Sequence, residues 1–184
     1  MFLTSIEYLL VFILSVNIIY LLIFSIASHC SPKNQEIRVN VLNRIVILIP
    51  AYKEDQVIME CVNSCLTQDY PKEKYDIIVI SDQMQDITIS TLEALPLKLI
   101  KVFFKDSTKA KALNYAMDEI GDNYDIAIIL DADNVVDSEF LSHINTSMNQ
   151  QGVEVVQAHR TAKNQNTKLA ILDAISEEIN NSIF

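Results

Sequence analysis

The distribution of hydrophobic and polar positions separates a long apolar stretch near the N-terminus from a series of shorter apolar segments. Residues 8–27 contain no charged side chain, and this run is long enough to cross a bilayer as one helix. A cleaved signal peptide would start with positive charge and carry a shorter apolar run, but Glu7 is the only charged residue before this one. The pattern therefore predicts an uncleaved transmembrane helix within residues 1–28.

Positive charge lies on one side only of this predicted helix. Lys33, Arg38 and Arg44 follow it, whereas no lysine or arginine precedes it. Because positive residues stay on the cytoplasmic side of a membrane, we expect a single-pass protein of the cell (inner) membrane with its soluble part in the cytoplasm. Residues 29–43 contain a Ser-Pro pair and little apolar pattern, and we expect them to form a connector.

Beyond residue 43, apolar runs of strand length alternate with stretches of helical periodicity. The predicted strands cover residues 44–51, 75–81, 97–104, 125–130 and 153–157, and the predicted helices cover residues 55–67, 87–94, 107–120, 137–148 and 168–183. Pro50 is expected to stop the first strand, and Ser107 is expected to cap the third helix. Strands that alternate with helices predict an α/β fold with a mainly parallel sheet flanked by helices.

Two aspartates, Asp131 and Asp133, directly follow the fourth predicted strand. Ligands of open α/β sheets bind beyond the carboxyl ends of the strands. Two carboxylates this close raise each other's pKa unless a cation lies between them. Mg²⁺ or Mn²⁺ fits that need, because a hard divalent ion keeps some waters and accepts phosphate oxygens from a substrate. The alternative is a turn in which both aspartates only cap the next helix.

Composition narrows the classes of ligand. The net charge of −10 argues against nucleic acid as a partner, since phosphate-backbone binding needs a basic surface. Gly121 and Gly152 are the only glycines, which excludes the glycine-rich phosphate loops. A nucleotide would therefore have to be bound by side chains and a metal. Cys61 and Cys65 have no further ligands at metal-binding spacing, and we expect them to be buried packing residues.

Motifs at several predicted strand ends resemble those of one enzyme family. Residues 50–54 (Pro-Ala-Tyr-Lys-Glu) resemble an opening Pro-Ala-Tyr-Asn-Glu, with lysine where asparagine is common, and Asp82 stands at the end of the second strand. Residues 109–114 resemble a Lys-Ala-x-Ala-Leu-Asn motif, and residues 131–133 match Asp-x-Asp. In this order the chain resembles a family-2 glycosyltransferase of the GT-A fold over about residues 44–184. Within this family, the chain resembles most the membrane-bound members, which are similar to cellulose and hyaluronan synthases.

The resemblance implies that the first two strand ends bind a nucleotide sugar, with UDP as its nucleotide. Pro50 and Ala51 belong to this implied binding segment, and Tyr52 either stacks on the base or is a half-buried packing residue. Asp82 either accepts a hydrogen bond from the imide N–H of uracil or caps a helix. Glu54 either binds the ribose or simply opens the next helix.

The remaining implied roles concern the diphosphate and the metal. Lys109 lies in the first turn of a predicted helix, where the helix dipole disfavours a cation unless an anion is near, so a phosphate contact is expected. Asp133 is the expected metal ligand, and Asp131 is expected to contact the ribose or a metal-bound water. The implied reaction is inverting transfer of the sugar to a glycan or lipid acceptor.

Part of the family's pattern is missing from the chain. The resemblance implies an acidic general base in a Thr-Glu-Asp-like motif and then a Gln-x-x-Arg-Trp motif, both farther along. Residues 157–161 imitate the spacing of the latter, but they come too early and end in threonine. We therefore expect the base beyond Phe184 and interpret the chain as the donor-binding part of a longer enzyme.

Two other interpretations stay open at this point. A membrane-tethered subunit could bind a nucleotide sugar without transferring it. The segment around Asp131 also resembles the first motif of haloacid-dehalogenase-type phosphatases, in which that aspartate would be a nucleophile.

Overall fold

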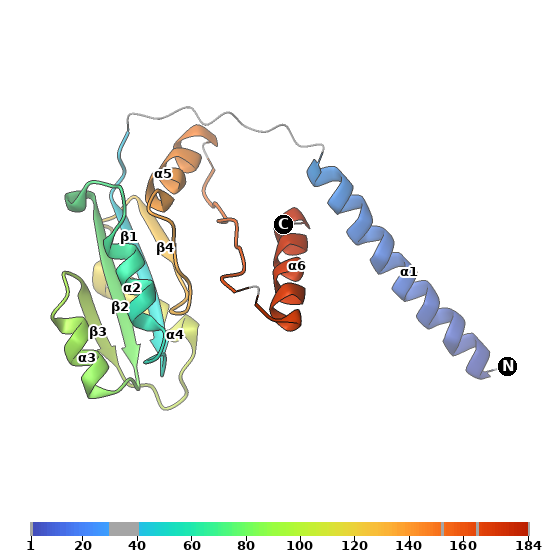
Figure 1. Cartoon of the computed structure of the whole chain (residues 1–184), viewed down its shortest axis with the longest axis horizontal. Coiled ribbons are helices and arrows are strands. Elements are labelled where there is room, and N and C mark those ends of the chain that lie inside the picture. Colours follow the sequence, from blue (N-terminus) through green and yellow to red (C-terminus); the bar gives the residue numbers. More distant parts are fainter. Residues whose placement is uncertain (1, 30–40, 152, 165, 184) are drawn as a thin grey trace. The chain divides into compact units, whose positions relative to one another are not determined.

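Four of the predicted strands form one parallel sheet in the computed structural model of the chain (Figure 1). Their order across the sheet is β3-β2-β1-β4, so β1 lies between two partners. The strands are β1 (Ile45–Tyr52), β2 (Tyr75–Asp82), β3 (Lys98–Val102) and β4 (Ile126–Ile129). The α/β class and the parallel sheet predicted from the sequence are confirmed.

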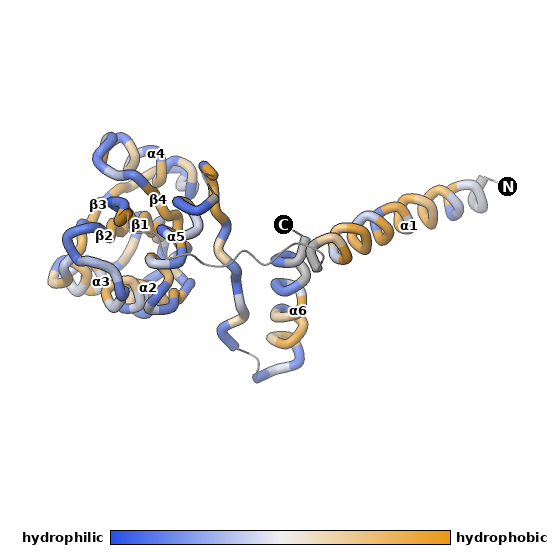
Figure 2. Tube along the Cα trace, turned by 90° about the horizontal axis from the view of Figure 1, so that it is seen from above, coloured by the Kyte–Doolittle hydropathy of each residue, from blue (hydrophilic) through white to orange (hydrophobic). Residues whose placement is uncertain are grey.

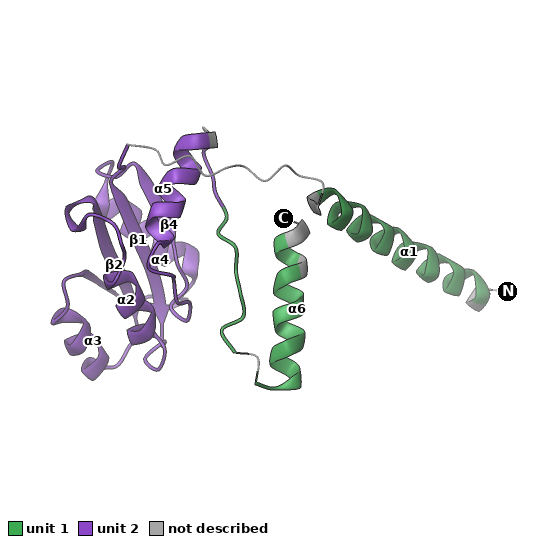
Figure 3. Cartoon of the chain, turned by 45° about the horizontal axis from the view of Figure 1, so that its top comes forward, with its two compact units in different colours: residues 1–35, 157–184 green, residues 36–156 purple. Residues whose placement is uncertain are grey.

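The structure describes residues 2–29, 41–151, 153–164 and 166–183. Most of the predicted connector, residues 30–40, lies outside this part of the chain. The helices are α1 (Phe2–His29), α2 (Ile58–Leu66), α3 (Asp86–Glu93), α4 (Lys109–Ile120), α5 (Phe140–Gln151) and α6 (Lys168–Ile183), with a 3₁₀ turn at Lys72–Lys74. Two compact units result, one of residues 36–156 and one of residues 1–35 with 157–184 (Figure 3).

Strand β1 is the centre of the hydrophobic core. No residue from Ile45 to Ile49 exposes more than 1 % of its surface. Val46 and Leu48 pack with α4 on one face, and the alternating residues of the strand point to the other face, where α2 crosses the sheet (Figure 1). Cys61 and Cys65 of α2 are fully buried, which confirms them as packing residues. Each fully buried aliphatic side chain contributes roughly 1.5–3 kcal/mol, so β1 is held firmly from both sides.

Pro50 does not stop β1 as predicted, because the strand continues to Tyr52. Leu48 accepts a backbone hydrogen bond from Leu130, and alternate residues of a strand direct their backbone groups to the same side. The missing N–H of Pro50 therefore falls on the β4 side. Pairing with β4 ends at Leu48, whereas pairing with β2 runs on to Tyr52. The proline ends one ladder and leaves the other intact.

Two further predictions about elements are wrong. The capping residue of α4 is Thr108, whose side chain accepts a hydrogen bond from the backbone of Lys111, and Ser107 is engaged elsewhere. Residues 153–157 form no strand. Their alternating apolar pattern is that of a strand, but a strand also needs a partner, and Val155 is 83 % exposed. Other boundaries differ from the prediction by a few residues.

Helix α1 has the length and composition of a membrane span between Thr4 and Ala27. Figure 2 colours most of the residues along this helix as hydrophobic. In the same compact unit, α6 also carries exposed apolar side chains, Leu169, Leu172 and Ile175.

Gly121 ends α4 in a conformation that L-residues avoid, with φ +57° and ψ −156°. An added Cβ would approach only Asn123 Nδ2, at 4.0 Å, so a substitution there strains the backbone without a steric clash. We expect Gly121→Ala to lower the free energy of unfolding by about 1–3 kcal/mol. Urea unfolding of the detergent-solubilised chain, followed by tyrosine fluorescence, measures this loss. Asp122→Ala, at the exposed neighbouring position, is the control, and equal stability of the two variants would contradict the account.

Candidate functional site

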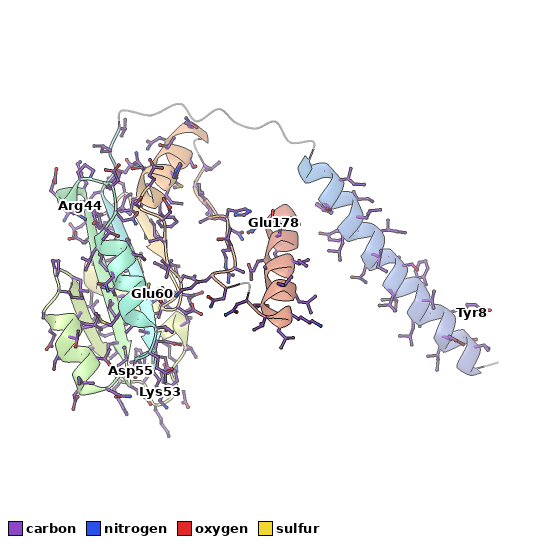
Figure 4. The ribbon with its side chains drawn as sticks, in the orientation of Figure 1. Tyr8, Arg44, Lys53, Asp55, Glu60 and Glu178 are labelled. Carbon is purple, nitrogen blue, oxygen red and sulfur yellow. The ribbon has the colours of Figure 1, made fainter. Side chains whose placement is uncertain are left out.

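A pocket of about 300 Å³ opens at the carboxyl edge of the sheet. Figure 4 shows this edge at the end marked by Lys53 and Asp55, opposite Arg44. It is lined by Pro50, Ala51, Tyr52, Glu54, Ile80, Asp82, Ser107, Thr108, Lys109, Ala112, Asp131, Ala132 and Asp133. All eight residues named from the sequence as candidate ligands of a nucleotide sugar are in this set. The structure thus brings four separate motifs around one cavity.

Asp82 is the most buried charged residue of the pocket, at 2 % exposure. As the last residue of β2, it is held by pairing with Tyr52 of β1 and Val102 of β3. Its Oδ2 accepts a hydrogen bond from the Ser107 hydroxyl, whereas its Oδ1 has no hydrogen-bond partner among the described residues. A buried acceptor without a donor costs about 1–3 kcal/mol, so this oxygen is suited to a donor group on a ligand.

The chain turns sharply just after both central strands. Lys53 and Gln83, which follow Tyr52 and Asp82, have φ values of +57° and +55°. Asparagine adopts this left-handed region more readily than lysine, which gives a physical reason for asparagine at position 53 in similar sequences. The turn places the Lys53 ammonium 4.9 Å from the centre of the Tyr52 ring. Tyr52 remains 45 % exposed, so part of its ring is available for stacking.

The two aspartates after β4 differ in their contacts. Asp131 accepts a hydrogen bond from Lys109, which lies in the first turn of α4, and the two side chains form an ion pair. Asp133 is exposed and lines the pocket. In the described part of the chain, no three His, Cys, Asp or Glu side chains cluster as a complete metal site. Two carboxylates nevertheless suit Mg²⁺ or Mn²⁺, which are commonly bound by one or two carboxylates together with substrate phosphates.

Glu54 fits both of its predicted roles. Its carbonyl accepts backbone hydrogen bonds from Val57 and Ile58 at 3.2 and 3.1 Å, so it opens α2. Its side chain lines the pocket.

Two polar residues of the pocket, Ser107 and Thr108, were not predicted as ligand-binding residues. The signal for them was the Ser-Thr pair directly before α4, of which only Ser107 was considered, as a helix cap. Two residues of the segment 157–161, which imitates the spacing of the Gln-x-x-Arg-Trp motif, contact α6. Arg160 pairs with Glu177 at 3.6 Å, and His159 lies 3.5 Å from Glu178.

Comparison with known proteins places the chain in a family. A family profile described as "Glycosyltransferase like family 2" matches residues 43–181, which is most of the chain. The chain therefore belongs to the family-2 glycosyltransferases. This match sets aside the haloacid-dehalogenase-type phosphatase considered from the sequence.

Two curated relatives illustrate the similarity. A dolichyl N-acetyl-alpha-D-glucosaminyl phosphate 3-beta-D-2,3-diacetamido-2,3-dideoxy-beta-D-glucuronosyltransferase of Methanococcus voltae is 28 % identical over 77 % of this chain and 43 % of its own length. A poly-beta-1,6-N-acetyl-D-glucosamine synthase of Staphylococcus aureus is 30 % identical over 58 % of this chain and 26 % of its own length. The chain thus spans less than half the length of these relatives.

Solved structures confirm the GT-A fold. The mannosyltransferase PcManGT of Pyrobaculum calidifontis, in complex with GDP-Man and Mn²⁺, matches 73 % of this chain and 41 % of its own, with a TM-score of 0.59 and 22 % identity. Staphylococcus aureus TarS in complex with UDP matches 66 % of this chain and 40 % of its own, with a TM-score of 0.51 and 19 % identity.

Cys61 links the core of α2 to the pocket, because its thiol donates to the carbonyl of Asp131 at 3.6 Å. A hydrogen bond with Cys65, burial, and the negative charges of Asp133 and Asp131 raise the pKa of the Cys61 thiol above its ordinary value. The thiolate form of Cys61 should therefore stay scarce in the folded chain as the pH rises.

We accordingly expect alkylation of Cys61 by iodoacetamide to remain slow in the folded chain between about pH 7 and about pH 9. In urea the rate should rise steeply over that range, because an unfolded thiol has a pKa near 8.5. Peptide mass spectrometry of quenched samples measures both rates. Equal pH dependence in the folded and unfolded chain would contradict this protection.

Proposed function

We propose that this chain binds a nucleotide-sugar donor, a UDP-sugar, in the pocket at the carboxyl edge of the sheet, and that the protein transfers the sugar to a glycan or lipid acceptor. The observation that carries the proposal is the buried Oδ1 of Asp82, which has no hydrogen-bond partner among the described residues, in a pocket that four separate motifs line. Solved proteins of the same fold in complex with UDP or GDP-Man support a nucleotide as the ligand class.

The base of the donor lies at the end of the pocket formed by β1 and β2. There the Asp82 Oδ1 accepts the imide N–H of uracil, which supplies the donor that this oxygen lacks. The half-exposed ring of Tyr52 stacks on the flat face of the base. Glu54, which lines the same pocket, is within the part assigned to the ribose.

The diphosphate lies toward α4 and the segment after β4. Lys109 holds Asp131 when no ligand is bound, and a diphosphate offers its ammonium a second anionic partner. Exchange of Lys109 from the carboxylate to the phosphate frees Asp131. Asp133, with Asp131, holds Mg²⁺ or Mn²⁺, which when bound neutralises negative charge on the departing diphosphate.

A second candidate is a subunit that binds the donor without transferring it. The support for it is that the four carboxylates of the pocket, those of Glu54, Asp82, Asp131 and Asp133, are all assigned to donor binding. None of these four is then left to act as a general base. An inverting transfer also needs a base within hydrogen-bond reach of the acceptor hydroxyl. Sugar transfer by the chain with acceptor present, measured beside UDP release, separates the two functions.

We further propose that α1 anchors the protein in the cell membrane, with the sheet on the cytoplasmic side. The support is the apolar segment between Thr4 and Ala27 and the positive charge that follows it in the sequence.

Metal-dependent binding of UDP should depend on Asp133. Asp133→Asn removes one negative charge with little change of volume, so the fold should persist while UDP affinity in Mn²⁺ falls by about 1–3 kcal/mol. Titration calorimetry with and without Mn²⁺ measures the loss. Asp137→Asn is the matched control, because Asp137 is exposed, lies outside the pocket and accepts a hydrogen bond from the backbone of Glu139 that asparagine can also accept. Unchanged UDP affinity in Asp133→Asn would refute the metal assignment.

The proposed orientation predicts the sites of proteolysis. Protease added to intact cells should leave residues 44–184 uncut, whereas the same protease should digest them in inside-out vesicles, because only there is the cytoplasmic side accessible. Immunoblotting against this domain measures both. Digestion in intact cells would contradict the proposed orientation. Release of the protein from membranes by alkaline carbonate would contradict the proposal that α1 is a membrane anchor.

A further inference from the structure

The hydroxyl of Ser107 makes the two oxygens of Asp82 unequal. Ser107 donates to Oδ2, while Oδ1 has no partner among the described residues. Because a carboxylate only accepts hydrogen bonds, one of its two oxygens is satisfied from within the protein, whereas the other is a buried acceptor without a donor among the described residues.

Both partners of this hydrogen bond are held in place by the surrounding structure. Asp82 is fixed by strand pairing on its two sides. Ser107 lies between β3 and α4, in a segment tied to the end of β2 by a 3.3 Å hydrogen bond from Gln83 Nε2 to the carbonyl of Phe104. On the other side of Ser107, Thr108 caps α4. The Ser107 hydroxyl is therefore held beside the Asp82 carboxylate, where it satisfies one of the two equivalent oxygens.

We propose that Ser107 is a positioning residue that makes the site select uracil over guanine, an inference that rests on the proposed binding of a nucleotide sugar. Uracil has one N–H, at N3, and matches a carboxylate with one unsatisfied oxygen. Guanine has adjacent donors at N1 and N2, and these match a carboxylate with both oxygens open. With the Ser107 hydroxyl already on Oδ2, guanine would leave one of its donors without an unshared oxygen beside the buried Asp82 carboxylate, which is costly.

Cytosine distinguishes this mechanism from a general loosening of the pocket. Its N3 carries no hydrogen, so its lone pair would face the Asp82 carboxylate whether or not Ser107 is present. Removal of the Ser107 hydroxyl should therefore improve binding of GDP relative to UDP and leave CDP weak. A variant with a merely distorted pocket would instead bind all three nucleotides less well.

The test is titration calorimetry of the full chain in detergent with Mn²⁺, using UDP, GDP, CDP and pyrophosphate as ligands. The unmodified chain should bind UDP at least about tenfold more tightly than GDP or CDP. In Ser107→Ala, the preference for UDP over GDP should fall by about tenfold, with CDP still weak and pyrophosphate affinity unchanged. Ser107→Thr keeps the hydroxyl and should restore the preference.

Ser90→Ala is the matched control, because the Ser90 hydroxyl also makes one hydrogen bond, to the carbonyl of Asp86 in α3, and lies outside the pocket. It should leave all four affinities unchanged. If Ser107→Ala still binds UDP and the ratio of UDP to GDP affinity is unchanged, the proposed role of Ser107 is overturned, whereas the proposed function is not. An unmodified chain that binds no nucleotide more tightly than pyrophosphate would overturn the proposed function itself. Unaltered circular dichroism spectra show that the variants are folded.

Discussion

The arrangement of the pocket depends on the parallel pairing of β1 on both of its sides. Pairing with β2 brings Asp82 beside Tyr52, and pairing with β4 brings Asp131 to the same edge of the sheet. Pro50 limits the second ladder, because its missing N–H falls on the β4 side. The chain after β4 is thereby free to turn, and Asp131 and Asp133 line the pocket instead of extending the sheet.

The charge of the pocket places a second constraint on any ligand. Four carboxylates, from Glu54, Asp82, Asp131 and Asp133, line it, whereas Lys109 is its only lysine or arginine among the described residues. A diphosphate entering such a pocket would be repelled unless positive charge accompanied it. The ion pair of Lys109 with Asp131 already uses that one cation. This electrostatic constraint supports the proposal that a divalent metal accompanies the donor, and the Asp-x-Asp motif supports it independently.

The sequence was sufficient for features that depend on local pattern. The four strands of the sheet and the residues at their ends follow from short apolar runs and from the charged residues placed directly after them. The sequence was insufficient where the structure of a segment depends on a partner that is distant in the sequence. Residues 153–157 alternate as a strand does but pair with nothing, and Pro50 continues a strand because the neighbouring ladder ends there. Ser107 looked like a helix cap because its partner, Asp82, lies 25 positions away in the sequence.

A crystal structure of the chain with UDP and Mn²⁺, with anomalous diffraction collected at the manganese edge, tests the central claim most directly. The account predicts the uracil N3 within hydrogen-bond distance of Asp82 Oδ1, and an anomalous peak between Asp133 and the diphosphate. A uracil ring placed away from the ends of β1 and β2, or manganese bound away from Asp133, would contradict it.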